Sequence, residues 1–209
     1  MSVFGSQLAP VSVSASSVPL PTMLAGTTVT INGIPAPLYY VSPTQLNIQI
    51  PYEVSLGPSL TVQNNGAGVN YILSVAGTAP AIFTTNAQGT GQGSILNNTT
   101  YQLVDASHPA TPGSTYIQIY CIGLGPVSNQ PPDGSASPSG PLAETTTPTQ
   151  VTIGNVQADV IFSGLAPGYV GLYQVNALVP AGVAAGSAVP VVISMGGASS
   201  NTVTIAVGP

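Results

Sequence analysis

The sequence predicts an all-β protein made of two tandem immunoglobulin-like β-sandwich modules. Three observations lead to this fold class: helix-type periodicity is absent, short strand patterns recur along the chain, and several sequence blocks occur twice in the same order. Many short strands separated by turn residues are typical of sandwiches rather than of alternating helices and strands.

The strand predictions rest on alternation of residue type. Near the end of the chain Val203, Ile205 and Val207 face one side of a predicted strand, and the residues between them face the other. No window holds an apolar i, i+3, i+4, i+7 stripe free of Gly and Pro. The expected strands are residues 28–31, 46–50, 60–62, 71–75, 116–122, 151–153, 159–162, 173–179, 189–194 and 202–207.

Repeated blocks indicate that the chain arose by duplication. The matching pairs are 4–10 with 120–126, 29–36 with 151–158, and 45–51 with 174–180. Matches in the same order are the signature of a tandem repeat. We therefore expect module one over residues 1–80 and module two over residues 81–209.

The two expected modules are unequal. Module two starts with an extra N-terminal strand segment, from residue 81 to about residue 116, that module one does not contain. Module one is therefore expected to lack its first strand, which would leave unpaired backbone N–H and C=O groups along a sheet edge. We expect a neighbouring molecule to fill this edge with a chain terminus or with residues 86–115.

The composition excludes several function classes. The chain has no Lys or Arg, and charged residues make up 2% of it, against about 25% in ordinary domains. Binding to nucleic acid or to anionic membrane surfaces needs cationic side chains. The 24 Gly and 21 Pro interrupt every apolar run, which argues against membrane insertion. An uncharged folded surface repels its own copies weakly, so the predicted partners are copies of the same chain.

The repeated blocks resemble a known family. The segments carrying this resemblance are 3–10, 29–51, 79–83, 122–126, 165–168, 171–176 and 196–201. Together they are similar to the Solibacter-type uncharacterised C-terminal domain, a family of secreted tandem β-sandwich repeats abundant in acidobacteria. The resemblance implies secretion, an extracellular or cell-surface location at the end of a large surface protein, and no established activity.

Candidate catalytic and metal-binding groups are few. Asp105, Ser107 and His108 offer the components of a triad, but they are neighbours in one turn, whereas a triad converges from across a fold. Cys121 lies on the apolar side of an alternating run and is expected to be buried. A calcium site at Asp133 would need backbone oxygens as further ligands. We therefore predict no enzyme activity, no catalytic, cofactor-binding or metal site, and no cofactor.

The predicted function is that of a structural subunit of an extracellular homopolymer, a filament or surface layer. Subunits would assemble head-to-tail by β-strand complementation, in which one subunit completes the sheet of the next. The alternative is a cell-surface adhesion or carbohydrate-binding module. In that case polysaccharide would be the partner, bound by the amides of the two Gln-x-Asn strands, at 45–47 and 174–176, beside Tyr39, Tyr40 and Tyr173.

Overall fold

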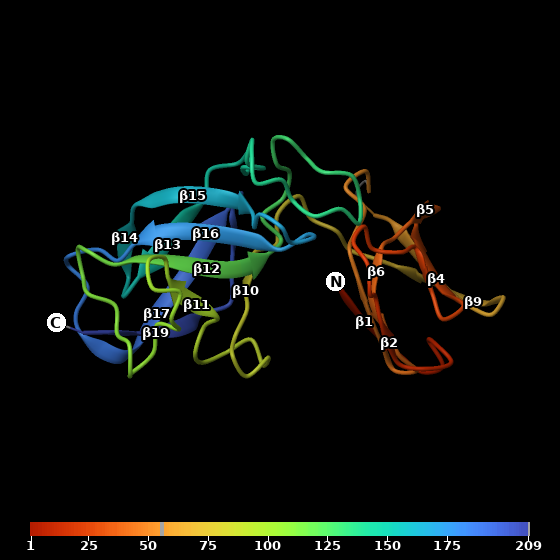
Figure 1. The fold of residues 1–209 in the computed structure, drawn as a ribbon, viewed down its shortest axis with the longest axis horizontal. Helices are drawn as coiled ribbons and strands as arrows, with labels where there is room; N and C mark the ends of the chain where they lie inside the picture. The colour runs from red at the N-terminus through yellow and green to blue at the C-terminus, as the bar shows by residue number, and fades with distance from the viewer. Residues whose placement is uncertain (55–56, 209) are drawn as a thin grey trace. The chain divides into compact units, whose positions relative to one another are not determined.

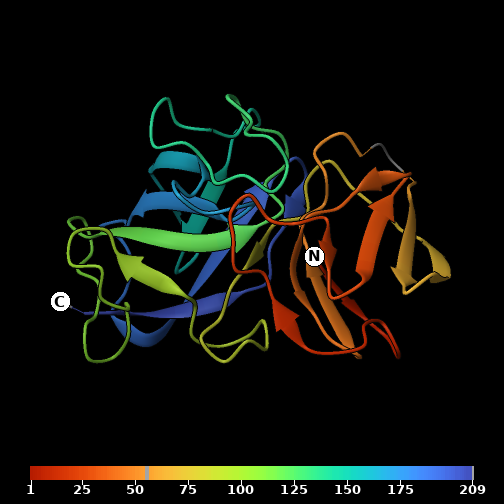
Figure 2. The same ribbon diagram turned by 45° about the vertical axis from the view of Figure 1, so that its right-hand side comes forward.

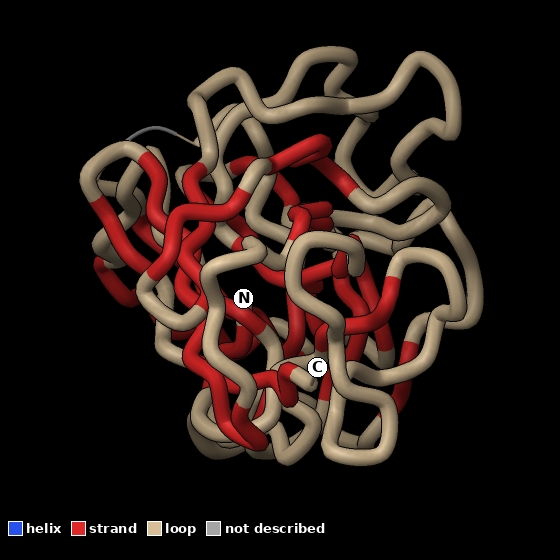
Figure 3. Tube along the Cα trace, turned by 90° about the vertical axis from the view of Figure 1, so that its left-hand side faces the viewer, coloured by secondary structure: helices blue, strands red, loops and turns tan. Residues whose placement is uncertain are grey.

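The computed structural model describes residues 1–54 and 57–208 of the chain. These residues form strands, turns and loops without any helix, as the tube in Figure 3 shows. Named strands pair only in antiparallel ladders. The all-β class predicted from the sequence is confirmed. Nothing in the described part of the chain has the length and hydropathy of a bilayer-crossing helix.

The chain divides into two compact units. In Figure 1 the strands of unit 1 run from red to gold, and those of unit 2 run from yellow-green to blue. Unit 1 comprises Met1–Ala76, Pro131–Pro138 and Pro167–Gly171, and unit 2 comprises Gly77–Gln130, Ser139–Ala166 and Leu172–Pro209. The expected boundary near residue 80 is close to the first of these divisions. The two later segments of unit 1 were not expected from the sequence.

Unit 1 contains two antiparallel sheets. One has the order β1-β7-β6-β2, and the other has the order β3-β4-β8-β9 with β5 paired to β4. The strands are β1 (Ser2–Phe4), β2 (Val13–Ser14), β3 (Met23–Leu24), β4 (Thr27–Ile31), β5 (Ile34–Pro35), β6 (Leu38–Val41), β7 (Gln45–Ile48), β8 (Ser59–Asn64) and β9 (Ala67–Ile72).

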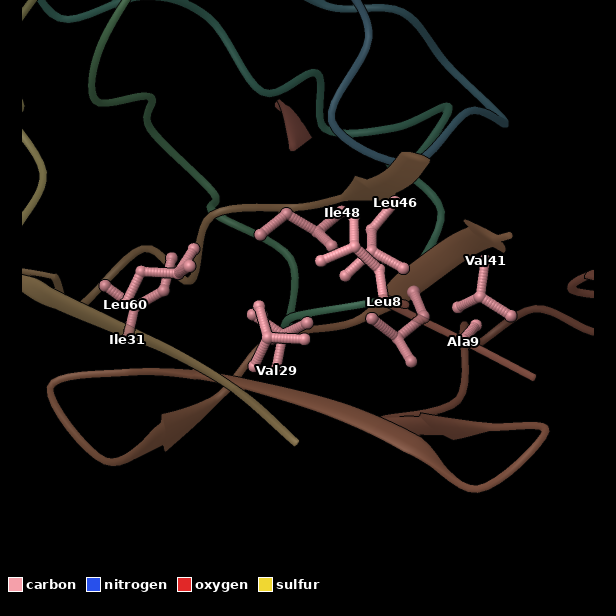
Figure 4. Packing of buried hydrophobic residues seen from close by; sticks show 11 residues of the cluster. Leu8, Ala9, Val29, Ile31, Val41, Leu46, Ile48 and Leu60 are labelled. Carbon is pink, nitrogen blue, oxygen red and sulfur yellow. The ribbon is translucent and has the colours of Figure 1, made fainter. Parts of the chain in front are cut away.

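The core of unit 1 lies between these sheets. Alternation in β4 buries Val29 and Ile31 while the residues between remain partly exposed, and β7 buries Leu46 and Ile48 in the same way. Figure 4 shows these side chains converging from the two layers. Full burial of one such side chain contributes about 1.5–3 kcal/mol, so the alternating pattern fixes which face of each strand turns inward.

The segments Pro131–Pro138 and Pro167–Gly171 are tied into unit 1 by hydrogen bonds. Leu20 N donates to Gly134 O at 2.8 Å, and Gly134 N donates to Gln49 Oε1 at 2.7 Å. The Tyr39 hydroxyl donates to Val170 O. Gln49 is buried, so its bond to Gly134 is worth more than an exposed one would be.

Unit 2 repeats the arrangement of two sheets and adds strands. One sheet has the order β10-β12-β16-β15 with β11 also paired to β12, and the other has the order β14-β13-β17-β18 with β19 also paired to β17. The strands are β10 (Ala81–Ile82), β11 (Ile95–Asn97), β12 (Tyr116–Ile122), β13 (Gln150–Ile153), β14 (Val156–Ala158), β15 (Val160–Leu165), β16 (Tyr173–Leu178), β17 (Gly186–Met195), β18 (Ala198–Ser199) and β19 (Val203–Val207).

Candidate assembly surface

The strands β1 and β7 of unit 1 pair in the way that β12 and β16 pair in unit 2. Val3 lies opposite Leu46, and Ile119 lies opposite Val175. Leu46 and Val175 belong to matching sequence blocks, and Val3 and Ile119 directly precede another matching pair. β12 is therefore the counterpart of β1, and β16 is the counterpart of β7.

The Gln-x-Asn side chains bond to one another. Gln45 Nε2 donates to Asn47 Oδ1 at 2.8 Å, and Gln174 Nε2 donates to Asn176 Oδ1 at 2.8 Å. The same intrastrand amide bond thus occurs in both units. Amide groups that satisfy each other within a strand stabilise the sheet and leave fewer donors and acceptors for a sugar.

The two units differ in what pairs with the outer edge of β1 and of its counterpart β12. In unit 2, β10 and β11 pair with the edge of β12 that faces away from β16. In the described part of unit 1, β1 is the terminal strand of its sheet. Gly5 N donates to Thr44 O and Ile48 N donates to Met1 O, so odd-numbered residues of β1 bond to β7. The N–H and C=O groups of Ser2 and Phe4 therefore point to the open edge.

The opposite sheets differ in the same way. Tyr71 of β9 lies opposite Leu60, and Val203 of β19 lies opposite Val191. The partners Leu60 and Val191 are both buried, which places Tyr71 and Val203 on the inner faces of their sheets. Val203 is 0% exposed, whereas Tyr71 is 67% exposed and Val69, also on the inner face, is 58% exposed.

Unit 2 covers its inner face with the segment between β10 and β12. Gln92 and Ala110 form parallel bridges to Thr204 and Val207 of β19. Gly93 lies so close to β19 that a Cβ there would be 2.9 Å from Val203 Cγ2. Residues 86–115, one of the two expected donors beside a chain terminus, therefore include residues that bridge to β19 within unit 2 itself.

The two open edges of unit 1 are apolar and uncharged. Besides Val69 and Tyr71 on the inner face, the outer faces of the edge strands expose Phe4 of β1 at 73% and Ile72 of β9 at 79%. Neither strand contains an acidic residue, and the chain has no Lys or Arg. In proteins that stay monomeric, Lys, Pro or a bulge usually keeps an edge strand from pairing with another chain. We call the free edges of β1 and β9, with Val69 and Tyr71 between them, the open side of unit 1.

The triad components form a turn. Asp105 Oδ1 accepts hydrogen bonds from Ser107 N at 2.8 Å and from His108 N at 3.0 Å. Its distance to His108 Nδ1 is 3.5 Å. The bond from Ser107 N, with further help from His108, lowers the pKa of the Asp105 carboxyl. These bonds close a local turn in which the carboxylate caps the backbone.

Cys121 lies in β12 with its side chain completely buried. Burial raises the pKa of its thiol well above the ordinary value. A thiol held in the protonated form is a weak nucleophile and a weak metal ligand. In the described part of the chain, no group of three or more His, Cys, Asp or Glu side chains is placed to hold a metal ion.

Asp133 lies beside Glu53, although the two residues are far apart in the chain and no local pattern predicts their pairing. Tyr52 N donates to Asp133 Oδ1 at 3.2 Å. Burial is the main cause that raises the pKa of the Asp133 carboxyl, and the nearby Glu53 carboxyl adds to it. Burial, together with the Asp133 charge, also raises the pKa of Tyr52 to about 12.

Comparison of the chain with models of protein families, with curated proteins and with solved structures finds no match.

Proposed function

We propose that this chain is a non-enzymatic structural subunit of an extracellular homopolymer, a filament or surface layer. The observation that carries the proposal is the open side of unit 1, where an exposed apolar face lies between two strand edges with unpaired backbone groups. Such a face is unfavourable in water and is stabilised when an extended segment pairs with the edge.

The proposal includes two tandem immunoglobulin-like modules, corresponding to residues 1–80 and 81–209. The matching ladders of β4 with β8 and of β13 with β17 support it, since Val29 lies opposite Val62 and Val151 lies opposite Ile193. On this basis unit 2 is the complete version of the module, and unit 1 is the version that needs a strand from outside.

The edge of β1 is the proposed acceptor for head-to-tail assembly. Its counterpart β12 carries β10 and β11 at the same edge, so an extended strand fits there in this module. A segment of a neighbouring subunit would bond to the free groups of Ser2 and Phe4 and cover the apolar face. Donor and acceptor surfaces differ, so the contact propagates into an open chain of subunits.

An extracellular or cell-surface location follows from the resemblance to the Solibacter-type repeats and remains part of the proposal. The second candidate, a carbohydrate-binding or adhesion module, receives less support. Its expected amides, on Gln45, Asn47, Gln174 and Asn176, bond to one another within their strands. Tyr39 of the expected aromatic group bonds to Val170 O.

The experiment compares the purified chain with Phe4→Lys by sedimentation velocity and electron microscopy. Phe4 is 73% exposed, so lysine there leaves unit 1 folded while placing a charge at the acceptor edge. We expect filaments from the wild type and loss of filaments from Phe4→Lys. Val11→Lys, an exposed site outside the strands, is the matched control and should keep assembling.

One result would refute head-to-tail assembly through β1. A wild-type chain that stays monomeric at high concentration, with the amides of Ser2 and Phe4 protected from hydrogen exchange, would show that this edge is closed within one molecule. Retention of this monomeric protein on polysaccharide resins would then favour the carbohydrate-binding alternative.

A further inference from the structure

The strand β9 has the features of an interface rather than of a protected edge. It forms the end of its sheet in Figure 1 and belongs to the golden hairpin that extends from unit 1 in Figure 2. Its register with β8 runs without a bulge from Asn64 opposite Ala67 to Ser59 opposite Ile72. All its residues are exposed, and none is charged or Pro. Straight, uncharged edges of this kind pair with other strands.

The backbone direction of β9 identifies its free groups. Leu73 N donates to Pro58 O, so the odd-numbered residues of this segment bond to β8. The even-numbered residues Gly68, Asn70 and Ile72 consequently direct their N–H and C=O groups outward. Bonding pairs in an antiparallel partner strand must therefore join even-numbered residues.

These outward groups are self-complementary. If two β9 strands meet antiparallel about a two-fold axis at Asn70, Asn70 bonds to Asn70 of the other copy and Gly68 bonds to Ile72. Ile72 then packs over a glycine, where no side chain obstructs it. On the inner face Val69 lies opposite Tyr71, and pairs of a β-branched and an aromatic residue are favourable.

We propose that β9 pairs antiparallel with β9 of a second copy, about a two-fold axis through Asn70, so that one sheet continues across both molecules. The second copy is the occupant because the same strand supplies every complementary feature and contributes no charge that would repel its copy. Thr61 Oγ1 donates to Asn70 Oδ1 at 2.7 Å, which holds this amide on the outer face of the sheet at the axis.

This contact goes beyond the proposed head-to-tail assembly, because it uses β9 rather than β1. A single strand pair buries less surface than the roughly 800 Å² per partner of a stable interface. The isolated pair is therefore expected to be weak and concentration-dependent. Many such contacts along two head-to-tail polymers would act together and join the polymers side by side.

The first test uses charge at the axis. In the Phe4→Lys background, which blocks the proposed polymer, Asn70→Lys and Asn70→Glu should each remain monomeric, because like charges meet across the axis. Mixed in equal amounts, the two variants should form a heterodimer by sedimentation equilibrium. Rescue by mixing identifies a contact of residue 70 with itself, and its absence would overturn the proposed register.

The second test uses disulfide formation. Directly bonded residues of antiparallel strands have Cα atoms about 5.5 Å apart, within the range that a disulfide spans. Asn70→Cys should therefore give a covalent dimer on mild oxidation, whereas Ile72→Cys should not, since its copies lie four residues apart, about 13 Å. Cys121 is buried and does not compete.

The outcomes separate the two proposals. Filaments that are lost in Phe4→Lys while Asn70→Cys still crosslinks support both contacts. A wild type without filaments whose Asn70→Cys variant crosslinks would refute head-to-tail assembly alone. Equal crosslinking of Asn70→Cys and Ile72→Cys, or none in either, would overturn the two-fold pairing of β9. Crosslinking of Ile72→Cys alone would also overturn it, in favour of another register.

Discussion

Asn201 holds Ile82 through both atoms of its side-chain amide. Oδ1 accepts from Ile82 N at 2.7 Å, and Nδ2 donates to Ile82 O at 3.0 Å. The strand β10 is only Ala81–Ile82, so a side chain supplies bonds that a longer ladder would make with backbone. At the corresponding place in unit 1, two residues before Tyr71, stands Val69, which cannot bond to a backbone in this way. The two units therefore differ at the residue that bonds to β10 in unit 2.

Replacing this amide should loosen unit 2. Asn201→Ala leaves the backbone groups of Ile82 without their partners, and each buried unsatisfied group costs about 1–3 kcal/mol. We expect unit 2 to lose roughly 2–4 kcal/mol of unfolding free energy, measured by urea unfolding. The neighbouring Thr202→Ala removes an exposed side chain and should change the midpoint little. Equal midpoints for the two variants would show that Asn201 does not fasten β10.

Cys121 provides a probe of unit 2 unfolding. Its thiol is completely buried and its pKa is raised by that burial, so the reactive thiolate is scarce in the folded state. We expect no labelling by a thiol reagent in native buffer and labelling in step with the unfolding of β12 in urea. Rapid labelling without denaturant would mean that β12 opens locally and would contradict the closed packing of this sheet.

Gly123 is required by a close backbone approach. A Cβ at this residue would lie 2.0 Å from Ala79 O, and its φ is +78°. Gly123→Ala should therefore destabilise unit 2 by more than about 3 kcal/mol, through overlap and backbone strain together. Gly197→Ala, with φ +83° and no atom within 4 Å, is the control for strain alone and should cost about 1–2 kcal/mol. Similar losses in both variants would contradict a role for the close approach.

Regular alternation made part of the fold predictable from the sequence. The strand expected at 116–122 coincides with β12, and that expected at 202–207 nearly coincides with β19. In each strand the alternate apolar residues of one face are buried, and this burial imposes a period of two on the sequence. The repeated blocks likewise led to the comparison of units, because equal ladders require equal patterns.

Other elements lacked such a signal. β6, Leu38–Val41, has an aliphatic or aromatic residue at every position and shows no alternation. The strand expected at 71–75 starts earlier, as β9 at Ala67, because the turn at Asn65 and Gly66 has positive φ at both residues and reverses the chain directly. The contact of Tyr52 with Asp133 spans 81 residues. No local sequence pattern predicts such a contact, because only tertiary packing brings the two residues together.

The Asp133 carboxyl should make unit 1 sensitive to pH. Its pKa is raised from the ordinary 3.8, chiefly by burial and further by Glu53. The folded state then binds a proton more tightly than the unfolded state. The contribution of Asp133 to stability is therefore fully present below pH 3.8 and declines as pH rises through the higher folded pKa. The two tyrosines at this place, Tyr52 and Tyr39, ionise far above this range.

Asp133→Asn removes this dependence while keeping an oxygen that accepts from Tyr52 N. At neutral pH the variant should be more stable than the wild type, because a carboxylate that is partly buried beside Glu53 is replaced by a neutral amide. Hydrogen exchange of β7 amides between pH 3 and pH 7, corrected for intrinsic exchange rates, measures the difference. Asp159→Asn, at an exposed site of unit 2, is the control. If Asp133→Asn makes unit 1 less stable than the wild type at neutral pH, the Asp133 charge stabilises the fold. That result would contradict the raised pKa of the Asp133 carboxyl.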